Sequence, residues 1–525
     1  MGEMNLAMHS TLTRRSRTYG LRARSPKTIA AFAWLGVVAL ATGCEPSEHA
    51  PSPSPTNAEP EAQANRDAKP NMLVYIVDTL RADALGTYGA DASTTPAADA
   101  FAQEGLVFDN AYAPSSWTRA SVASILTGEY PIAHGAEDRG DRLGDDATVL
   151  PEVLSQSGYY TGLITTNPNV GSFFGFRQGF DDLVELYDAK DTAEIHSAAL
   201  IASADDVADA VEQWLDKAPE PFLLVVLSID PHSPYSPPSD YIPALKSGQH
   251  AALDGTGHWI NRKDLSGADQ ERIRSLYAGE VRYADAGFGR VLKSLRTRGL
   301  EQRTISVLTS DHGEEFWEHG IRGHGKSLYD EALRVPLIIR APGRIDAGIR
   351  SDRHAETIDI LPTLLDLASL PKLEGIAGES LVAEPDSPLA GSSAEAPVYA
   401  SLTLGKHRML AVRDRDWKLI WDLNSGTKEL FDMRAPGEQT NAAPGAPART
   451  AALMTLLTNH RERTEQRRTD IYGAGGTADA PPATLPDIER ALLIELGYID
   501  QKSNEESDEG QNEESDDKID AQGPR

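Results

Sequence analysis

Long apolar runs that end in an aspartate are the clearest pattern along the chain. They cover residues 72–77, 222–229 and 304–309, and they are followed by Asp78, by Asp230, and by Ser310 with Asp311. Continuous apolar runs of this length are typical of strands that are buried on both faces of a sheet. The pattern therefore predicts buried strands that each carry a carboxylate at the carboxyl end.

Helical patterns lie between these runs, at 96–104, 148–157, 204–217 and 270–298. Alternating strands and helices predict an α/β fold with a mainly parallel, doubly wound sheet flanked by helices. Ligands of such sheets bind beyond the carboxyl ends of the strands, so Asp78, Asp230 and Asp311 are candidates for one site. Each of these aspartates fits equally well as a cap on a neighbouring helix.

The pattern changes after about residue 385. Short strand-like segments at 397–402, 409–413 and 417–421 predict a smaller antiparallel sheet. A helix is expected over 449–466, a loop over 471–484 and a short final helix over 486–496. We therefore expect a larger domain over 71–385 and a C-terminal subdomain with its helices over 386–500.

The amino-terminal residues 1–44 have the layout of a signal peptide, in which six basic residues precede an uncharged, largely apolar run over 29–41. Cys44, the only cysteine, follows Gly43 and resembles the lipid-modified end of a lipobox. The alternatives are cleavage without lipid and a single membrane anchor, but the run is shorter than the roughly 20 residues that span a bilayer. We expect an extracytoplasmic protein that is lipid-anchored to a bacterial membrane, in the periplasm or at the cell surface.

Charge and composition bound the partners. The formal net charge is −29, with 79 acidic and 50 basic residues, so the surface repels polyanions and nucleic acid is not an expected partner. Residues 45–70 are rich in proline and small polar residues, which predicts a disordered tether. Residues 501–525 contain almost nothing apolar, which predicts a disordered acidic tail.

A series of short motifs occurs in the order found in one enzyme family. In chain order they are NMLVYIVDTLR at 71–81, LTGEYP at 126–131, DPHSPY at 230–235, SDHGE at 310–314, HGK at 324–326 and LFDM at 430–433. The colinear series resembles the sulfatase family of the alkaline-phosphatase-like superfamily, in a bacterial lipoprotein member. The resemblance implies the family's α/β architecture with a smaller C-terminal part.

The resemblance also implies a metal site, with Asp78, Asp311 and His312 as ligands. Oxygen ligands at strand ends suit a hard divalent cation. One Ca²⁺ ion is expected, with Mg²⁺ and Zn²⁺ as the alternatives. Many relatives carry a second aspartate directly after the first, whereas this chain has Thr79 there.

The nucleophile has two candidates. Sulfatases use a formylglycine made from the Cys or Ser that opens a Cys/Ser-x-Pro-Ser-Arg motif, and aligning on the arginine puts Ser115 at that position. Alignment without gaps from residues 126–128 puts Thr118 there instead, at the start of a helix that can stabilise an anionic group. Thr118 is preferred and implies a direct alkoxide nucleophile, so formylglycine stays open. In either alignment Arg119 is expected to contact the transferred group, although such a Ser/Thr cluster also fits a helix cap.

Two further residues fall on catalytic positions of the family. His232 is expected to act as a general acid on the leaving group, and Lys326 to offset developing negative charge. His319 and His324 lie nearby in the sequence. The Lys and His that many arylsulfatases carry after the second strand are absent from residues 164–169, where Asn167 is a possible hydrogen-bond donor.

These patterns favour a metal-dependent hydrolase of sulfate esters, a sulfuric ester hydrolase. Hydrolysis or transfer of phosphoryl or phosphonate esters with Thr118 as the nucleophile is the alternative within the superfamily. A catalytically inactive surface binding protein is the alternative from another class. The sequence leaves the particular substrate and the oligomeric state open.

Overall fold

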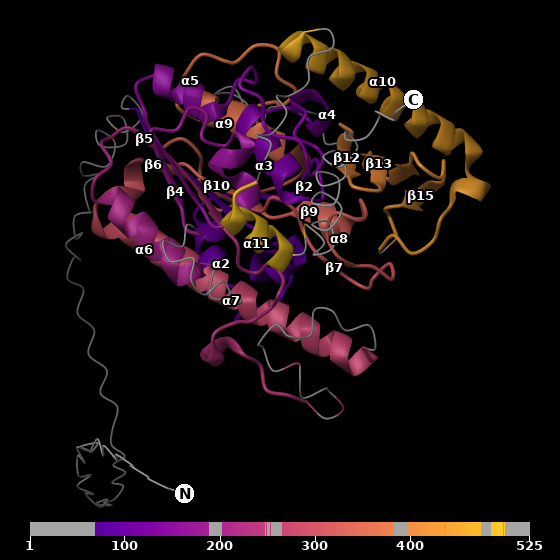
Figure 1. The fold of residues 1–525 in the computed structure, drawn as a ribbon, viewed down its shortest axis with the longest axis horizontal. Helices are drawn as coiled ribbons and strands as arrows, with labels where there is room; N and C mark the ends of the chain where they lie inside the picture. Colours follow the sequence, from indigo (N-terminus) through magenta and orange to yellow (C-terminus); the bar gives the residue numbers. More distant parts are fainter. Residues whose placement is uncertain are drawn as a thin grey trace, which may run out of the picture. The chain divides into compact units, whose positions relative to one another are not determined.

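The computed structural model describes residues 69–187, 202–246, 248, 253, 265–382, 396–435, 437–473, 485–496 and 498 (Figure 1). The predicted signal peptide with Cys44, nearly all of the predicted tether and the predicted acidic tail lie outside the described residues. Most of the loop predicted over 471–484 also lies outside them.

The core of the fold is a nine-stranded sheet in the order β11-β2-β10-β6-β1-β5-β3-β4, with β9 paired to β2. The strands are β1 Asn71–Val77, β2 Leu106–Tyr112, β3 Tyr160–Thr165, β4 Asp182–Glu185, β5 Phe222–Ser228, β6 Thr304–Thr309, β9 Arg334–Val335, β10 Leu337–Arg340 and β11 Ile349–Glu356. β1 lies between β5 and β6 and is parallel to both. Only the pairs made by β9 and β10 are antiparallel within this sheet.

Helices cover both faces of the sheet. Side chains alternate along β1, so that Leu73 and Tyr75 join one apolar cluster while Val74 and Ile76 join another. One face packs against α2 Pro96–Gln103, α6 Ala204–Leu215 and α7 Gly267–Thr297. The other packs against α3 Thr118–Thr127, α5 Leu150–Gln156 and α9 Ile360–Leu367. The predicted doubly wound fold is confirmed.

A separate four-stranded antiparallel sheet follows, in the order β12-β13-β14-β15. Its strands are β12 Val398–Leu404, β13 His407–Arg413, β14 Trp417–Asp422 and β15 Lys428–Asp432. The long helix α10 Pro447–Tyr472 packs against β13 and β14, and the last helix among the described residues is the short α11 Asp487–Glu495. The predicted smaller antiparallel sheet is therefore present. Among the described residues no helix is both long and apolar enough to cross a membrane.

Candidate metal centre and nucleophile

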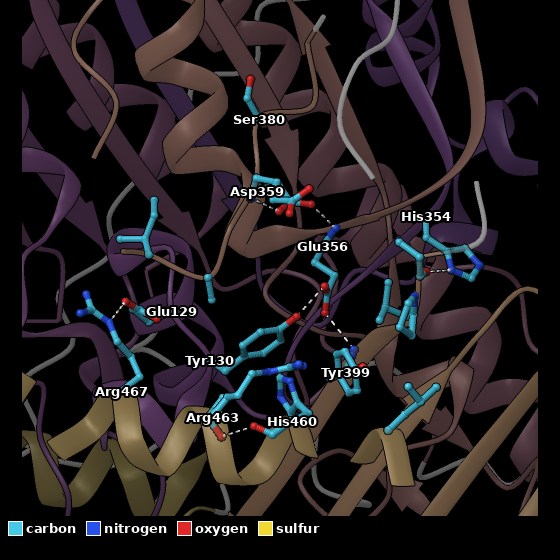
Figure 2. Close-up of a pocket in the computed structure, with 18 of the residues that line it drawn as sticks. Glu129, Tyr130, His354, Glu356, Asp359, Ser380, Tyr399, His460, Arg463 and Arg467 are labelled. Atoms are coloured by element: carbon cyan, nitrogen blue, oxygen red, sulfur yellow. Dashed lines mark hydrogen bonds and ion pairs between the residues drawn. The ribbon is translucent and has the colours of Figure 1, made fainter. Parts of the chain in front are cut away.

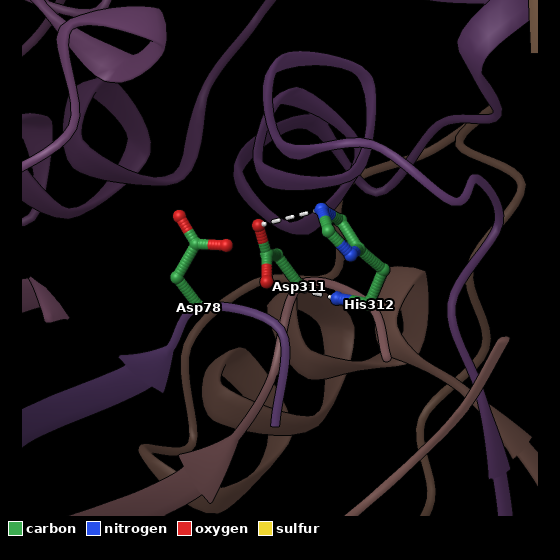
Figure 3. Close-up of side chains that lie close together, drawn as sticks. All are labelled: Asp78, Asp311 and His312. Carbon is green, nitrogen blue, oxygen red and sulfur yellow. Dashed lines mark hydrogen bonds and ion pairs between the residues drawn. The ribbon is translucent and has the colours of Figure 1, made fainter. Parts of the chain in front are cut away.

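Three buried side chains lie together at the carboxyl edge of the central sheet. Ligand atoms of Asp78, Asp311 and His312 are all within 4.8 Å of one another (Figure 3). Asp78 directly follows β1, and Asp311 and His312 follow the neighbouring parallel strand β6. The parallel pairing of these two strands therefore brings together residues that are more than 230 positions apart in the sequence.

Hydrogen bonds fix the two carboxylates. Asn167 Nδ2 donates to Asp78 Oδ2 at 2.7 Å. Asp311 Oδ1 accepts from the backbone N–H groups of Thr79, at 3.2 Å, and His312, at 2.9 Å. Thr79 has φ 58°, a conformation that is rare for a β-branched residue, and its N–H reaches Asp311 in that conformation.

The donor set fits a divalent cation. Asp78 Oδ1 and Asp311 Oδ2 are buried and accept no hydrogen bond, which is costly for ionised carboxylates unless a positive charge is bound beside them. Burial and the charge of Asp311 raise the pKa of Asp78, and burial raises the pKa of Asp311. His312 Nδ1 contacts the Gly313 carbonyl at 2.9 Å, so its Nε2 lone pair faces Asp311 Oδ2 at 3.5 Å. These residues would hold a metal through one nitrogen and two oxygen ligands.

Thr118 stands beside this cluster. It is the first residue of α3, and its Oγ1 lies 3.3 Å from His312 Nε2. Ser121, one turn further along the helix, donates to the Asp311 carbonyl at 2.5 Å, which ties the start of α3 to the cluster. Helix N–H groups at this end favour an anionic group next to Thr118.

Ser115 lies in the loop before α3, and its Oγ is buried without a hydrogen-bond partner. Of the two candidate nucleophiles, only Thr118 has a hydroxyl in contact with a residue of the Asp78, Asp311 and His312 cluster among the described contacts. The geometry therefore favours the alignment that places Thr118 first.

Arg119 does not donate to the cluster in the described structure. Its NH1 donates to the carbonyls of Asp138, Arg139 and Asp141 at 3.1, 2.8 and 2.7 Å. Its NH2 donates to Asn169 Oδ1 at 2.8 Å, and the guanidinium lies 3.4 Å from the centroid of the Phe174 ring. Burial lowers the pKa of Arg119 to about 9. This arginine holds the loop 138–141 against α3, rather than extending toward a transferred group as the sequence led us to expect.

His232 reaches the same edge of the sheet from the loop after β5. Its Nδ1 lies 2.5 Å from the Ser233 carbonyl, which leaves Nε2 directed into the site. Burial lowers the pKa of His232 to about 3, with a further contribution from the neighbouring His324. The centroid of the His324 ring lies 4.9 Å from that of His232 and 4.5 Å from that of His312. His324 therefore lies between the proposed general acid and the proposed metal ligands.

Lys326 is the most peripheral of the expected residues. Its side chain is exposed, and its Nζ donates to the Arg322 carbonyl at 2.8 Å. Partial desolvation lowers the pKa of Lys326, while the charge of Glu314 acts in the opposite direction. No described contact joins Lys326 to Thr118 or to the three clustered side chains.

Asp230 and His319 have other tasks. Asp230 Oδ2 accepts from the backbone N–H of Ala204 at 2.7 Å, so this aspartate caps α6, and burial raises its pKa to about 7. His319 Nε2 lies 3.1 Å from Glu331 Oε2, and its ring stacks on Tyr329 with centroids 3.6 Å apart. Of the strand-end aspartates, two therefore belong to the cluster and one is a helix cap.

Two buried residues at the site, Glu314 and Tyr498, were not among the residues predicted from the sequence. Glu314 accepts from Tyr235 at 3.0 Å and lies 3.1 Å from His324 Nδ1, so it orients that ring. The Tyr498 hydroxyl lies 3.0 Å from Thr118 Oγ1 and 3.0 Å from His232 Nε2. The SDHGE motif contains Glu314 and marks its region, whereas nothing in the sequence around Tyr498 resembles a motif.

A separate cavity of about 600 Å³ lies at the other end of α3 (Figure 2). It is lined by residues from β11, β12 and α10, including two buried carboxylates, Glu356 and Asp359. Glu356 accepts from the Tyr130 hydroxyl at 2.7 Å and from the Tyr399 N–H at 3.0 Å. Burial raises the pKa of Glu356 from 4.5 to about 8, with Asp359 contributing.

This shift predicts a pH-dependent stability. A carboxyl whose pKa is higher in the folded state stabilises the fold fully below pH 4.5, and the contribution is lost as the pH rises through about 8. The melting temperature and the unfolding free energy of the wild type should both fall between about pH 5 and pH 9. In Glu356→Gln the fall in unfolding free energy over this range should be smaller by roughly 2 to 4 kcal/mol. Calorimetry with the exposed Glu374→Gln as control checks this, and equal slopes for both variants would contradict it.

Comparison with known proteins places these features in a family. The sulfatase family model matches residues 70–370, and the model of the N-sulphoglucosamine sulphohydrolase C-terminal region matches residues 318–466. An arylsulfatase of Clostridium perfringens is 26% identical over 444 residues, 71% of this chain and 90% of that protein. An N-acetylglucosamine-6-O-sulfatase of Bacteroides thetaiotaomicron is 25% identical over 467 residues, 72% of this chain and 83% of that protein.

Solved structures show the same fold. A structure in complex with its substrate D-glucosamine-2-N,6-O-disulfate has a TM-score of 0.62 at 23% identity, over 76% of this chain and 99% of that one. A phosphonate monoester hydrolase of Agrobacterium radiobacter has a TM-score of 0.62 at 23% identity, over 75% of this chain and 96% of that one. With its doubly wound sheet, its second antiparallel sheet and a family match across the larger part of its length, this chain belongs to the sulfatase family.

Proposed function

We propose that this chain hydrolyses sulfate esters with Thr118 as a direct nucleophile and one divalent cation, Ca²⁺, held by Asp78, Asp311 and His312. The observation that carries the proposal is the position of Thr118 Oγ1, 3.3 Å from His312 Nε2 at the N-terminus of α3. The carboxylate oxygens of the cluster that lack donors support the metal. The family membership supports the sulfuric ester as substrate.

In the proposed reaction Thr118 is the nucleophile and His232 is the proton donor. Thr118 Oγ1 loses its proton to water and, as the alkoxide, attacks the sulfur of the ester while the bond between sulfur and the leaving oxygen breaks. His232 Nε2, held toward the site by the contact of Nδ1 with Ser233, supplies a proton to the leaving oxygen. The negative charge of a bound ester favours the protonated ring and offsets the low pKa, about 3, that burial gives it. Water then releases sulfate from Thr118. A divalent cation, when bound, polarises the ester oxygen and favours the alkoxide form of the nucleophile.

Phosphoryl or phosphonate esters are the second candidate substrates. A threonine is not a precursor of formylglycine, and a direct hydroxyl nucleophile suits phosphoryl transfer as well as sulfuryl transfer. The fold is shared with a phosphonate monoester hydrolase, and this likeness concerns the fold alone.

Turnover of matched activated esters tests the proposal. We expect 4-nitrophenyl sulfate to be hydrolysed with a higher kcat/KM than 4-nitrophenyl phosphate or its phosphodiester, in parallel assays with Ca²⁺, Mg²⁺, Mn²⁺ and Zn²⁺. Dominant turnover of a phosphorus ester would move the substrate class to the second candidate. Absence of turnover with every ester and metal would instead indicate a binding protein.

A further inference from the structure

The C-terminal part of the chain closes the candidate active site. Tyr498 lies 380 residues after Thr118 in the sequence, yet its hydroxyl is 3.0 Å from Thr118 Oγ1 and 3.0 Å from His232 Nε2. Its ring stands near Trp117, His232 and His324, with centroids 6.3, 5.6 and 5.8 Å apart. The phenol thus lies between the proposed nucleophile and the proposed general acid.

The segment that carries Tyr498 is packed against the larger domain. We use "C-terminal cover" for α11 Asp487–Glu495 together with Leu496 and Tyr498. Leu492, Leu493 and Leu496 are buried, and α11 packs against the short helix η3 Pro168–Val170, which follows Asn167. The loop that Arg119 supports completes the attachment, because Arg139 Nε donates to the Tyr498 carbonyl at 2.6 Å.

In this arrangement the side chains of the reacting groups are shielded from solvent. Thr118, Asp78, Asp311 and His312 are fully buried, and His232 is 5% exposed. An ester must place its reacting sulfur next to Thr118 Oγ1 and its leaving oxygen next to His232 Nε2. Both atoms already contact the Tyr498 hydroxyl. Two groups cannot fill one place, so the ester and the phenol exclude each other.

We propose that the C-terminal cover is an intramolecular competitor, in which the Tyr498 phenol occupies the place of the ester oxygen until the cover moves away. The inference rests on the proposed function for the identity of the ester, and it concerns the competition between the phenol and the ester for the site. The protein then exists as a closed form and an open form, and only the open form binds substrate. Its apparent affinity for an ester is reduced by the fraction of molecules that are open.

Two substitutions of Tyr498 in the full chain test the competition. Tyr498→Ala removes the ring, and Tyr498→Phe removes only the hydroxyl that contacts Thr118 and His232. We expect kcat/KM for 4-nitrophenyl sulfate to rise about tenfold in the alanine variant and by a smaller factor in the phenylalanine variant. Tyr159→Phe is the matched control, because Tyr159 is buried at the opposite, amino-terminal edge of β3 and its hydroxyl has no hydrogen-bond partner.

The same variants separate an occupant from a participant. If the phenol relayed a proton between Thr118 and His232, Tyr498→Phe would lower kcat, and this result would overturn the proposal. Unchanged kcat/KM in both Tyr498 variants, with Tyr159→Phe also unchanged, would overturn it as well.

A measurement without turnover keeps this test independent of the proposed reaction. Inorganic sulfate should compete with the phenol, so amide hydrogen exchange in residues 487–496 of the wild type should become at least about threefold faster in saturating sulfate. If neither sulfate nor phosphate makes amide exchange in residues 487–496 faster, the proposal that the C-terminal cover is a competitor is overturned. Faster exchange in a protein that hydrolyses no sulfate ester would retain the competitor and reject the proposed function.

Discussion

Thr118→Ala should lower kcat/KM for 4-nitrophenyl sulfate by about 10³-fold or more, because it removes the attacking oxygen. Thr118 is not one of the three proposed metal ligands, although its hydroxyl contacts His312 and Tyr498 and interacts with Asp311, so its loss leaves Asp78, Asp311 and His312 to bind the ion. The metal-dependent rise in melting temperature should therefore be retained. Steady-state kinetics and calorimetry on the same preparation check both parts.

Two control variants make this result specific to the nucleophile. Thr118→Ser keeps a hydroxyl at the start of α3 and should retain activity within about tenfold of the wild type. Ser115→Ala removes a hydroxyl that has no partner and should leave kcat/KM nearly unchanged. The opposite ranking, with Ser115→Ala inactive and Thr118→Ala active, would restore Ser115 and a formylglycine as the nucleophile.

Asp311→Asn should abolish the metal dependence of both activity and stability. In the wild type, removal of metal by a chelator leaves two buried carboxylates, Asp78 and Asp311, facing each other, and the folded state loses the binding free energy of the ion. At a metal concentration 100 times the dissociation constant this free energy is about 2.7 kcal/mol. We expect the chelated wild type to melt several degrees lower than the loaded protein, and Asp311→Asn to melt at one temperature in both conditions.

Without metal, substitution of a cluster carboxylate should not lower the stability of the protein. Asp78→Asn removes one of the two carboxylates whose proximity raises the pKa of Asp78, so without metal this variant should be at least as stable as the wild type. Asp285→Asn is the matched control: Asp285 accepts from the N–H groups of Ala97 and Ala98, and its substitution should lower stability equally with and without metal. Bound metal is counted directly by elemental analysis. Full metal occupancy in Asp311→Asn would contradict the assigned site.

The fold was predictable because its strongest determinants are local. The apolar runs at 72–77, 222–229 and 304–309 correspond to β1, β5 and β6, and the helix predicted over 96–104 corresponds to α2 Pro96–Gln103. Each is a buried strand or a helix with clear ends, so hydrophobic pattern and punctuation suffice. β11 Ile349–Glu356 has the sequence IRSDRHAE and reads as polar, because it pairs only with β2 and half of its side chains are not buried.

The site was predictable where chemistry follows from strand position. Asp78 directly follows β1, and Asp311 and His312 lie within three residues of the end of the adjacent parallel strand β6, positions that the apolar runs of the sequence already predict. The direction of a side chain is a different matter: Arg119 lies next to Thr118 in the sequence, yet its guanidinium contacts the loop 138–141. Tyr498 could not be predicted at all, since its contacts depend on how a terminal helix packs rather than on any local pattern.

Every residue of α3 is buried, including Thr118, Ser121 and Ser124. A helix that is enclosed on all sides has no face that accepts larger side chains without displacing its neighbours. Adaptation of this chain to esters of another shape, by natural drift or in the laboratory, therefore has little room on the helix that carries the nucleophile. Productive changes should instead gather in the loops beyond the strands and in the C-terminal cover, which contact the same site.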